Sequence, residues 1–426
     1  MQTERPVYEE IEELLRTVQL PRMALVEQVS GTPPELGDIR GAVREALQEV
    51  ELPTGSVAVG VGSRGVARID EVTAALVEVL KEAGAEPFVV PAMGSHGASS
   101  AEGQAEVLRH LGVSEETVGC PIRATMETVL VGETPSGVPV YVDKHAHEAD
   151  AIVVVNRVKP HTAFRGTVES GPTKMLAIGL GKQKGAHVIH SVGWGEIHRT
   201  IPEAARVMVE TGRFAFGLAV VENADEEPCR VAAIPAGRFE EAEGPLLEEA
   251  KRNLMRLPFG ELDVLVVDEI GKNISGDGAD PNVTGRFPTP YGGESSTRVE
   301  RMVFLGLTEA TGGNATGLGA ADVVTERLAG NVDRASTYMN ALTATAPTAA
   351  KTPMAMPDDR KAIAAAITLC AGIDPARVRL ARIKNTLHLR QLWVSEALLD
   401  EVEDNDDLRV VEGPGKMRFD EDGTLT

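Results

Sequence analysis

The stretch Ser56–Val61 (Ser-Val-Ala-Val-Gly-Val), followed by Gly62–Gly65 (Gly-Ser-Arg-Gly), decides the fold class of this chain. After its first residue the run is apolar, which is typical of a parallel strand that is buried on both faces. A helical spacing of apolar residues follows over Asp70–Ala83. This order of strand, loop and helix predicts an α/β fold with mostly parallel sheets, in which ligands bind beyond the carboxyl ends of the strands.

Two further strand-like runs end in loops that carry a strongly polar side chain. Pro87–Pro91 precedes the loop that contains His96, and Ala151–Val155 precedes the loop that contains His161. Because the carboxyl ends of parallel strands meet at one edge of a sheet, we expect Arg64, His96 and His161 to face one cleft. Histidines titrate near neutral pH and suit acid/base catalysis, while an arginine favours an anion. The pattern indicates an enzyme.

Composition narrows the class of protein. The chain has 426 residues, enough for two or three domains, and its net charge of −22 argues against a nucleic-acid backbone or an anionic membrane as partner. Three scattered cysteines indicate a reducing compartment and exclude a disulfide framework. The polar first residues contain no signal peptide. No apolar run approaches the roughly 20 residues of a membrane span, so the expected location is the cytoplasm.

The domain organisation follows from a shift in composition. An acidic, helix-forming stretch at 240–257 ends at Pro258, and a new apolar strand begins at Leu262. We predict two α/β domains with an active-site cleft between them: an N-terminal cofactor-binding and catalytic domain at 1–258 and a C-terminal domain at 259–400. The acidic tail at 401–426 is expected to pack back on the N-terminal domain.

Two local predictions concern single elements. The runs 126–131 and 138–142 flank Thr134-Pro135-Ser136-Gly137, which predicts a hairpin on the edge of the sheet. The stretch 320–328 is expected to be a helix in the second half of the chain.

The segment Gly60–Gly65 also matches G-x-G-x-x-G, the pattern of a dinucleotide-binding loop. Glycines there let the backbone approach a pyrophosphate, and Glu86 lies near the position of a ribose-binding acid. The motif is short and glycine is abundant in this chain, so three readings stay open. These are an NAD-type site, another phosphate or carboxylate site, and a bare turn.

The densest group of polar and glycine residues lies downstream, at 169–174 and 179–185, with His187 and His190 after it. Glycines and three lysines suit a phosphate-bearing cofactor, because backbone donors and ammonium groups can surround it. A solvated basic loop is the alternative. We expect cofactor contacts from Ser63, Ser170, Gly171, Pro172, Lys174, Lys182 and Lys184.

In order and approximate spacing these motifs resemble the lactate racemase family. The resemblance covers about residues 55–200 and is carried by Arg64, His96, Pro160-His161, the run 170–174 and His190. The sixteen-residue separation of Lys174 and His190 (190 minus 174) is its most specific part.

The resemblance implies a nickel-pincer nucleotide cofactor, made by maturation enzymes from a nicotinic acid-derived precursor. Lys174 would be joined to the pincer through a thioamide, and His190 would complete the nickel coordination. His96 and His161 would be the catalytic bases on opposite faces of the substrate, and Arg64 would hold or polarise it.

The sequence departs from the family pattern at three places. Val61 stands where an aspartate is common, and the stretch from His161 to Lys174 is longer than in lactate racemase. The family takes the substrate carboxylate with a lysine of the second domain, for which only Lys272 or Arg286 is a candidate here. These departures imply a substrate other than lactate.

The predicted function is therefore racemisation or epimerisation of a small 2-hydroxy acid by reversible hydride transfer from C2, because that hydrogen is a poor acid beside a carboxylate. The expected partners are this substrate and the maturation enzymes, without nucleic acid or membrane, and a homo-oligomer stays open. Two alternatives remain: an NAD(P)-dependent oxidoreductase that uses the Gly60–Gly65 loop, and a non-catalytic nucleotide- or metal-binding homologue.

Overall fold

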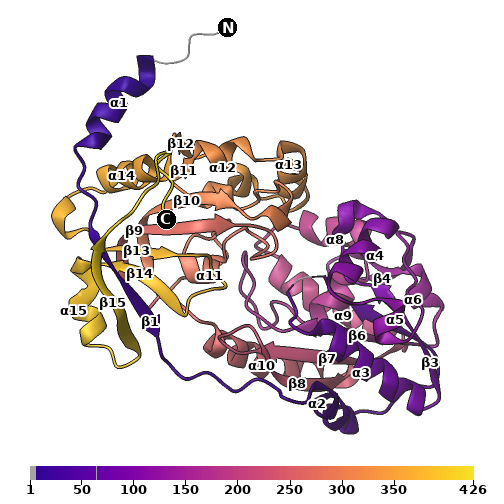
Figure 1. Cartoon of the computed structure of the whole chain (residues 1–426). Coiled ribbons are helices and arrows are strands. Elements are labelled where there is room, and N and C mark those ends of the chain that lie inside the picture. The colour runs from indigo at the N-terminus through magenta and orange to yellow at the C-terminus, as the bar shows by residue number, and fades with distance from the viewer. Residues whose placement is uncertain (1–5, 64) are drawn as a thin grey trace. The chain divides into compact units, whose positions relative to one another are not determined.

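A computed structural model describes residues 6–63 and 65–426, which form two compact units (Figure 1). The central unit is Thr32–Leu254, and the terminal unit combines Met1–Gly31 with Met255–Thr426. The chain thus leaves the terminal unit after its first strand, completes the central unit, and returns.

The central unit is built on a five-stranded sheet in the order β3-β2-β6-β7-β8. Its strands are β2 (Gly55–Val61), β3 (Ala85–Pro91), β6 (Ala151–Arg157), β7 (Phe214–Glu222) and β8 (Pro228–Pro235). The first four are parallel and β8 is antiparallel to β7. Val59 pairs with Val89 on one side and Val153 on the other, and all three are fully buried. The predicted α/β class is confirmed.

Helices cover both faces of this sheet, which explains why its strands are apolar on both faces. One face is covered by α2 (Ile39–Ala46), α3 (Ile69–Glu82), α4 (Ala101–His110) and α5 (Glu115–Val118). The other is covered by α6 (Lys144–Glu148), α8 (Lys182–Ser191), α9 (Ile197–Glu210) and α10 (Phe239–Asn253). In α3 the spacing of Val72, Leu76 and Leu80 buries one stripe, and each such side chain contributes roughly 1.5–3 kcal/mol.

The strand order places the ligand-binding edge. From β2 the chain moves outward to β3 and then returns to β6 on the other side of β2. The connections after β2 and β6 therefore lead away from each other, and a crevice opens at the carboxyl ends of these two strands. The loops that contain Ser63 and His161 begin at this point.

The predicted hairpin exists, but its expected place on the sheet edge is wrong. β4 (Thr128–Glu133) and β5 (Pro139–Asp143) form a separate two-stranded sheet. Val138, Val140 and Val142 of this hairpin join the apolar core that contains α8 and α9. These valines are thus buried against helices, while the backbone of β5 pairs with β4.

The terminal unit contains an eight-stranded mixed sheet in the order β12-β11-β10-β9-β13-β14-β1-β15. The strands are β1 (Arg22–Gln28), β9 (Glu261–Ile270), β10 (Arg298–Leu307), β11 (Val323–Thr325), β12 (Met354–Met356), β13 (Leu380–Ile383), β14 (Gln391–Ser395) and β15 (Leu408–Lys416). Its helices are α1 (Pro6–Arg16), α11 (Pro281–Thr284), α12 (Glu326–Gly330), α13 (Arg334–Thr343), α14 (Asp359–Leu369) and α15 (Leu399–Glu403).

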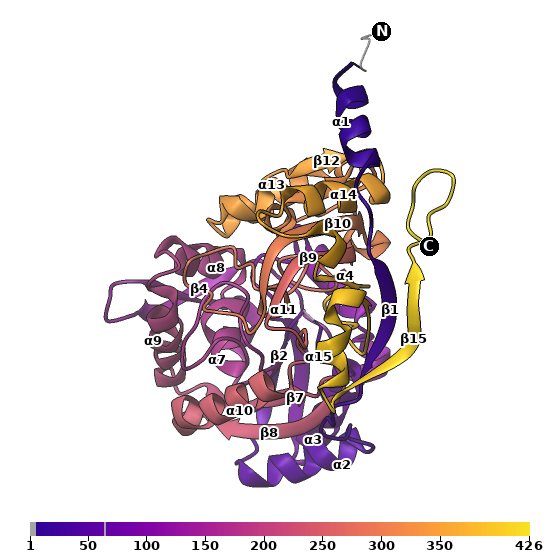
Figure 2. The ribbon, with the colours of Figure 1, turned by 90° about the vertical axis from the view of Figure 1, so that its left-hand side faces the viewer.

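The ends of the chain differ from the predicted domains. β1, placed by sequence in the first domain, belongs to the terminal unit, where it pairs with β14 and β15 and buries Met23, Ala24 and Val26. Figure 2 shows β1 beside β15. The tail, expected to pack back on the N-terminal domain, belongs to the terminal unit, where β15 is an edge strand beside β1. The predicted helix at 320–328 is split into β11 and α12, since Val323 and Val324 extend the parallel sheet.

None of the helices in the described residues combines the length and hydropathy that spanning a bilayer requires.

Candidate functional site

A buried ion pair supports the loop that follows β2. Arg157, at the end of β6, forms an ion pair with Glu222 at the end of β7. Glu222 also accepts a hydrogen bond of 2.8 Å from the Ala67 backbone N–H. Burial raises the pKa of Glu222, while Arg157 opposes that rise. The pair thus anchors the loop that begins with Ser63, whereas Arg64 lies outside the described residues.

The loop after β3 brings His96 to Ser63. The hydroxyl of Ser63 and Nδ1 of His96 are hydrogen-bonded, and both residues are half-buried. The backbone N–H of Gly94 donates to the carbonyl of Gly179 over 3.1 Å, which ties this loop to the segment that follows Lys174. Two residues predicted from different loops therefore meet.

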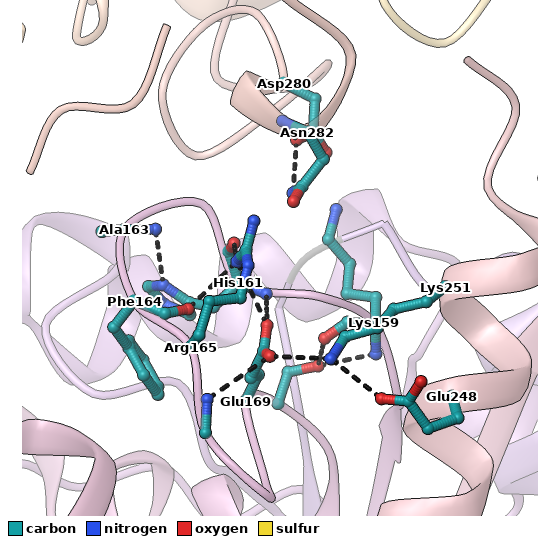
Figure 3. A network of polar contacts seen from close by, with 12 residues as sticks. Lys159, His161, Ala163, Phe164, Arg165, Glu169, Glu248, Lys251, Asp280 and Asn282 are labelled. Carbon is teal, nitrogen blue, oxygen red and sulfur yellow. Dashed lines mark hydrogen bonds and ion pairs between the residues drawn. The ribbon is translucent and has the colours of Figure 1, made fainter. Parts of the chain in front are cut away.

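The loop after β6 is organised around the buried carboxylate of Glu169 (Figure 3). One oxygen accepts the backbone N–H of His161 over 2.8 Å and lies 3.2 Å from Arg165. The other lies 3.1 Å from Lys251 of α10. Two cations compensate the burial of this charge, so Glu169 holds the backbone of His161 in place.

The ring of His161 has a defined hydrogen-bond direction. Its Nδ1 lies 3.0 Å from the backbone nitrogen of Ala163, and a backbone N–H can only donate. Nδ1 is therefore an acceptor, and the neutral ring carries its proton on Nε2.

An aromatic cluster joins the loop of His161 to the end of α8. The ring centroid of His161 lies 4.4 Å from Phe164 and 6.0 Å from Trp194. Trp194 in turn lies 5.6 Å from His190. Two histidines predicted for different roles thus contact one tryptophan. Sequence reasoning missed Trp194, although one of the two tryptophans of the chain lies four positions after His190.

Lys174 ends a short helical turn, α7 (Pro172–Lys174), which is supported by a buried acid. Thr173 donates its backbone N–H and its hydroxyl to one oxygen of Glu243, over 3.0 and 2.7 Å. A Cβ at Gly171, where φ is +110°, would lie 2.6 Å from the other oxygen, so only glycine fits. Burial raises the pKa of Glu243 to about 8. Sequence analysis gave no signal for Glu243.

The remaining residues of the predicted cofactor loop take different positions. Ser170 accepts the backbone N–H of Lys159 over 2.8 Å and donates to the carbonyl of Lys159 over 2.6 Å. Lys184 is exposed, with Nζ 4.2 Å from the ring centroid of Tyr141. Lys182 differs from the prediction, because its side chain is fully buried in an ion pair with Asp143. It is therefore left out of the proposed cofactor contacts.

The two candidate carboxylate ligands lie in the terminal unit. Nζ of Lys272 donates to the carbonyl of Gly276 over 2.8 Å. Arg286 lies 2.8 Å from Asp322 and donates to the carbonyl of Glu300 over 2.7 Å. Arg286 thus stabilises its own loop.

Comparison with known proteins identifies the family of the central unit. Residues 46–199 match the family model of the lactate racemase N-terminal domain. The central unit thus contains a lactate racemase N-terminal domain. This confirms the resemblance predicted from the motifs, and the matched residues include His96, His161, Lys174 and His190.

Solved structures and curated proteins add the following. The structure of the lactate racemase apoprotein from Thermoanaerobacterium thermosaccharolyticum is similar to this chain, at 12% sequence identity. The match covers 85% of this chain and 94% of the apoprotein chain, with a TM-score of 0.47. No curated protein matches the chain.

Proposed function

We propose that this chain is a racemase or epimerase of a 2-hydroxy acid that depends on a nickel-pincer nucleotide. The observation that carries the proposal is the contact of Trp194 with both His161 and His190. It joins a predicted acid/base group to the predicted metal ligand within the central unit.

The residues of the central unit fit such a cofactor. Among residues 6–63 and 65–426, no group of three or more His, Cys, Asp or Glu side chains is placed to hold a metal ion. A metal at His190 would therefore take most of its ligands from an organic group, as in a pincer complex. We propose Lys174 as the covalent attachment and His190 as the protein ligand, with further contacts from Ser63, Ser170, Gly171, Pro172 and Lys184. When bound, this cofactor supplies reversible hydride transfer at C2 of the substrate.

The two strand-end histidines divide the proton transfer. In its neutral form His161 presents Nε2–H, because Ala163 occupies Nδ1, and so it donates a hydrogen bond to a substrate oxygen without losing the proton. It would deliver a proton only as imidazolium, with both ring nitrogens protonated, which also requires release of Ala163. His96, whose Nδ1 is bound to the hydroxyl of Ser63, takes the proton of the substrate hydroxyl on Nε2. With the opposite enantiomer the roles are exchanged, which requires His161 to release Ala163.

The substrate is proposed to be a small carboxylate other than lactate. Arg64 is proposed to bind or polarise it, and Lys272 and Arg286 stay candidate ligands of its carboxylate. Cofactor-maturation enzymes are the proposed protein partners.

The test follows the hydrogen at C2. The chain is produced together with the maturation enzymes and given C2-deuterated 2-hydroxy acids, from lactate to sugar acids, in ordinary water. Retention of deuterium at C2 during inversion supports the proposal. Washout to solvent during inversion of a true substrate contradicts it, because proton abstraction by histidine exchanges the hydrogen with water. Absence of nickel and of added mass in the active protein contradicts the cofactor assignment.

The dinucleotide alternative gains no support from the Gly60–Gly65 loop. Gly60 lies inside β2, and α3 begins only at Ile69, so the third glycine does not open a helix as a phosphate-binding turn requires. Turnover of a 2-hydroxy acid would also exclude a non-catalytic homologue.

A further inference from the structure

Three buried polar side chains lie behind the His96 loop, and the proposed reaction does not use them. Lys182, Asp143 and Gln104 have no exposed surface. Nζ of Lys182 lies 2.8 Å from Asp143 and 3.2 Å from the side-chain oxygen of Gln104. It also donates to the carbonyl of Pro91, the last residue of β3.

Gln104 extends these contacts to the backbone around His96. Its side-chain nitrogen donates to the carbonyl of Gly94 over 2.8 Å and to the carbonyl of His96 over 3.3 Å. The start of α4 also lies directly against this loop, since a Cβ at Gly103 would be 2.1 Å from the carbonyl oxygen of Gly97. The loop therefore has little room to move on the side of α4.

Lys182 ties the same loop to the segment that contains Lys174 and His190. It is the first residue of α8, the helix that leads to His190, and its φ is +54°, a left-handed value that lysine rarely adopts. Burial lowers the pKa of Lys182, whereas Asp143 opposes that effect. A strained backbone and a buried cation are both unfavourable, so they indicate that the contacts of this ammonium group have a role.

We propose that Lys182, Asp143 and Gln104 are positioning residues that fix His96 relative to the Lys174–His190 segment. The inference rests on the proposed function, because that function gives His96 and this segment their roles. It differs from the predicted role of Lys182, in which this side chain would contact the cofactor itself.

The first test measures the reactivity of His96 in the chain produced without the maturation enzymes. Gln104→Leu removes the donors to Gly94 and His96, and Gln104→Glu removes them while keeping an acceptor for Lys182. Modification by diethyl pyrocarbonate is followed for each histidine by peptide mass spectrometry. We expect the rate at His96 to rise by about threefold in both variants as the loop opens locally. The rates at His110 and His187, which are exposed, should not change.

The second readout separates positioning from loss of stability. Thr134→Ala, a buried threonine in the turn of the β4–β5 hairpin, serves as the matched control. In the loaded enzyme we expect Gln104→Glu to lower kcat by about tenfold or more with a smaller change in KM, because a displaced acid/base group reduces the rate of chemistry. The cofactor mass on Lys174 should be retained.

The inference is overturned if the modification rate at His96 in both Gln104 variants equals that of the wild type and of Thr134→Ala. Failure of the proposed function has a different signature: the wild-type protein then carries no cofactor mass and inverts no hydroxy acid. The reactivity of His96 is measured without cofactor, so the two outcomes are distinguishable.

Discussion

The backbone N–H of Ala163 donates a hydrogen bond of 3.0 Å to Nδ1 of His161. The two residues are close neighbours in sequence, and Glu169 fixes the backbone of His161 at the same time. Because both partners of this hydrogen bond belong to the protein, the tautomer of His161 can be predicted for the chain without cofactor.

In the chain without cofactor, the neutral ring of His161 should carry its proton on Nε2. Nitrogen NMR of histidine-labelled protein, with His161→Gln to assign the signal, distinguishes the two tautomers. A signal that places the proton on Nδ1 would contradict the structure. His187, which is exposed, provides the reference of a solvated ring.

Loss of either strand-end histidine should slow inversion without loss of metal. We expect His96→Ala and His161→Ala each to reduce kcat by about 100-fold or more, the usual scale for a positioned acid/base group. Nickel content, measured by elemental analysis, should equal that of the wild type. His110→Ala is the control and should retain full activity. A near-normal rate in either variant would remove that histidine from the mechanism.

Substitutions of Lys174 and of His190 should separate cofactor attachment from metal binding. Lys174→Ala should abolish the added mass in intact-protein mass spectrometry, because no amine is left to form the linkage. His190→Ala should keep the added mass and lose nickel on dialysis, since one ligand is removed. Stoichiometric nickel in His190→Ala would mean that another residue, for example His187, is the nickel ligand.

Glu243 should make the stability of the central unit depend on pH. Its pKa is raised by burial to about 8 in the folded chain from an ordinary value of 4.5, so between these values the folded state holds a proton that the unfolded state lacks. Stability from this group is fully present below pH 4.5 and is lost as pH rises towards 8, by at most about 1.4 kcal/mol per pH unit.

Glu243→Gln mimics the protonated side chain and should therefore remove this pH dependence. The Tm of the wild type relative to that of the variant should fall between pH 5 and 8. Glu241→Gln on the same helix is exposed and serves as the control. Parallel curves for wild type and Glu243→Gln would mean that Glu243 is charged when folded.

The strands of the central sheet were predictable because each carries its own signal. Val57, Val59 and Val61 lie in a short run bounded by turn residues, and such a run needs no partner to be recognised. β1 and β15 carry weaker signals. Glu27 interrupts the first, the second contains Gly413 and Pro414, and each depends on pairing with the other.

The candidate site was predictable only where function depends on exposed polar residues in loops. His96 and His161 follow recognisable strands, so their convergence could be inferred. The supporting residues could not, because their roles depend on burial. In the sequence, Gln104 is indistinguishable from a surface residue of a helix. Lys182 is likewise indistinguishable from the other lysines of the glycine-rich loop.

The pairing of β1 with both β14 and β15 has a consequence for synthesis on the ribosome. The central unit is continuous in sequence, so it can begin to fold once Leu254 has left the exit tunnel. β1 is made before the central unit but must wait for the strands at 391–395 and 408–416, which are made after it. β1 therefore stays without its partners while the whole central unit is synthesised, and the terminal unit closes only after residue 416 has been made.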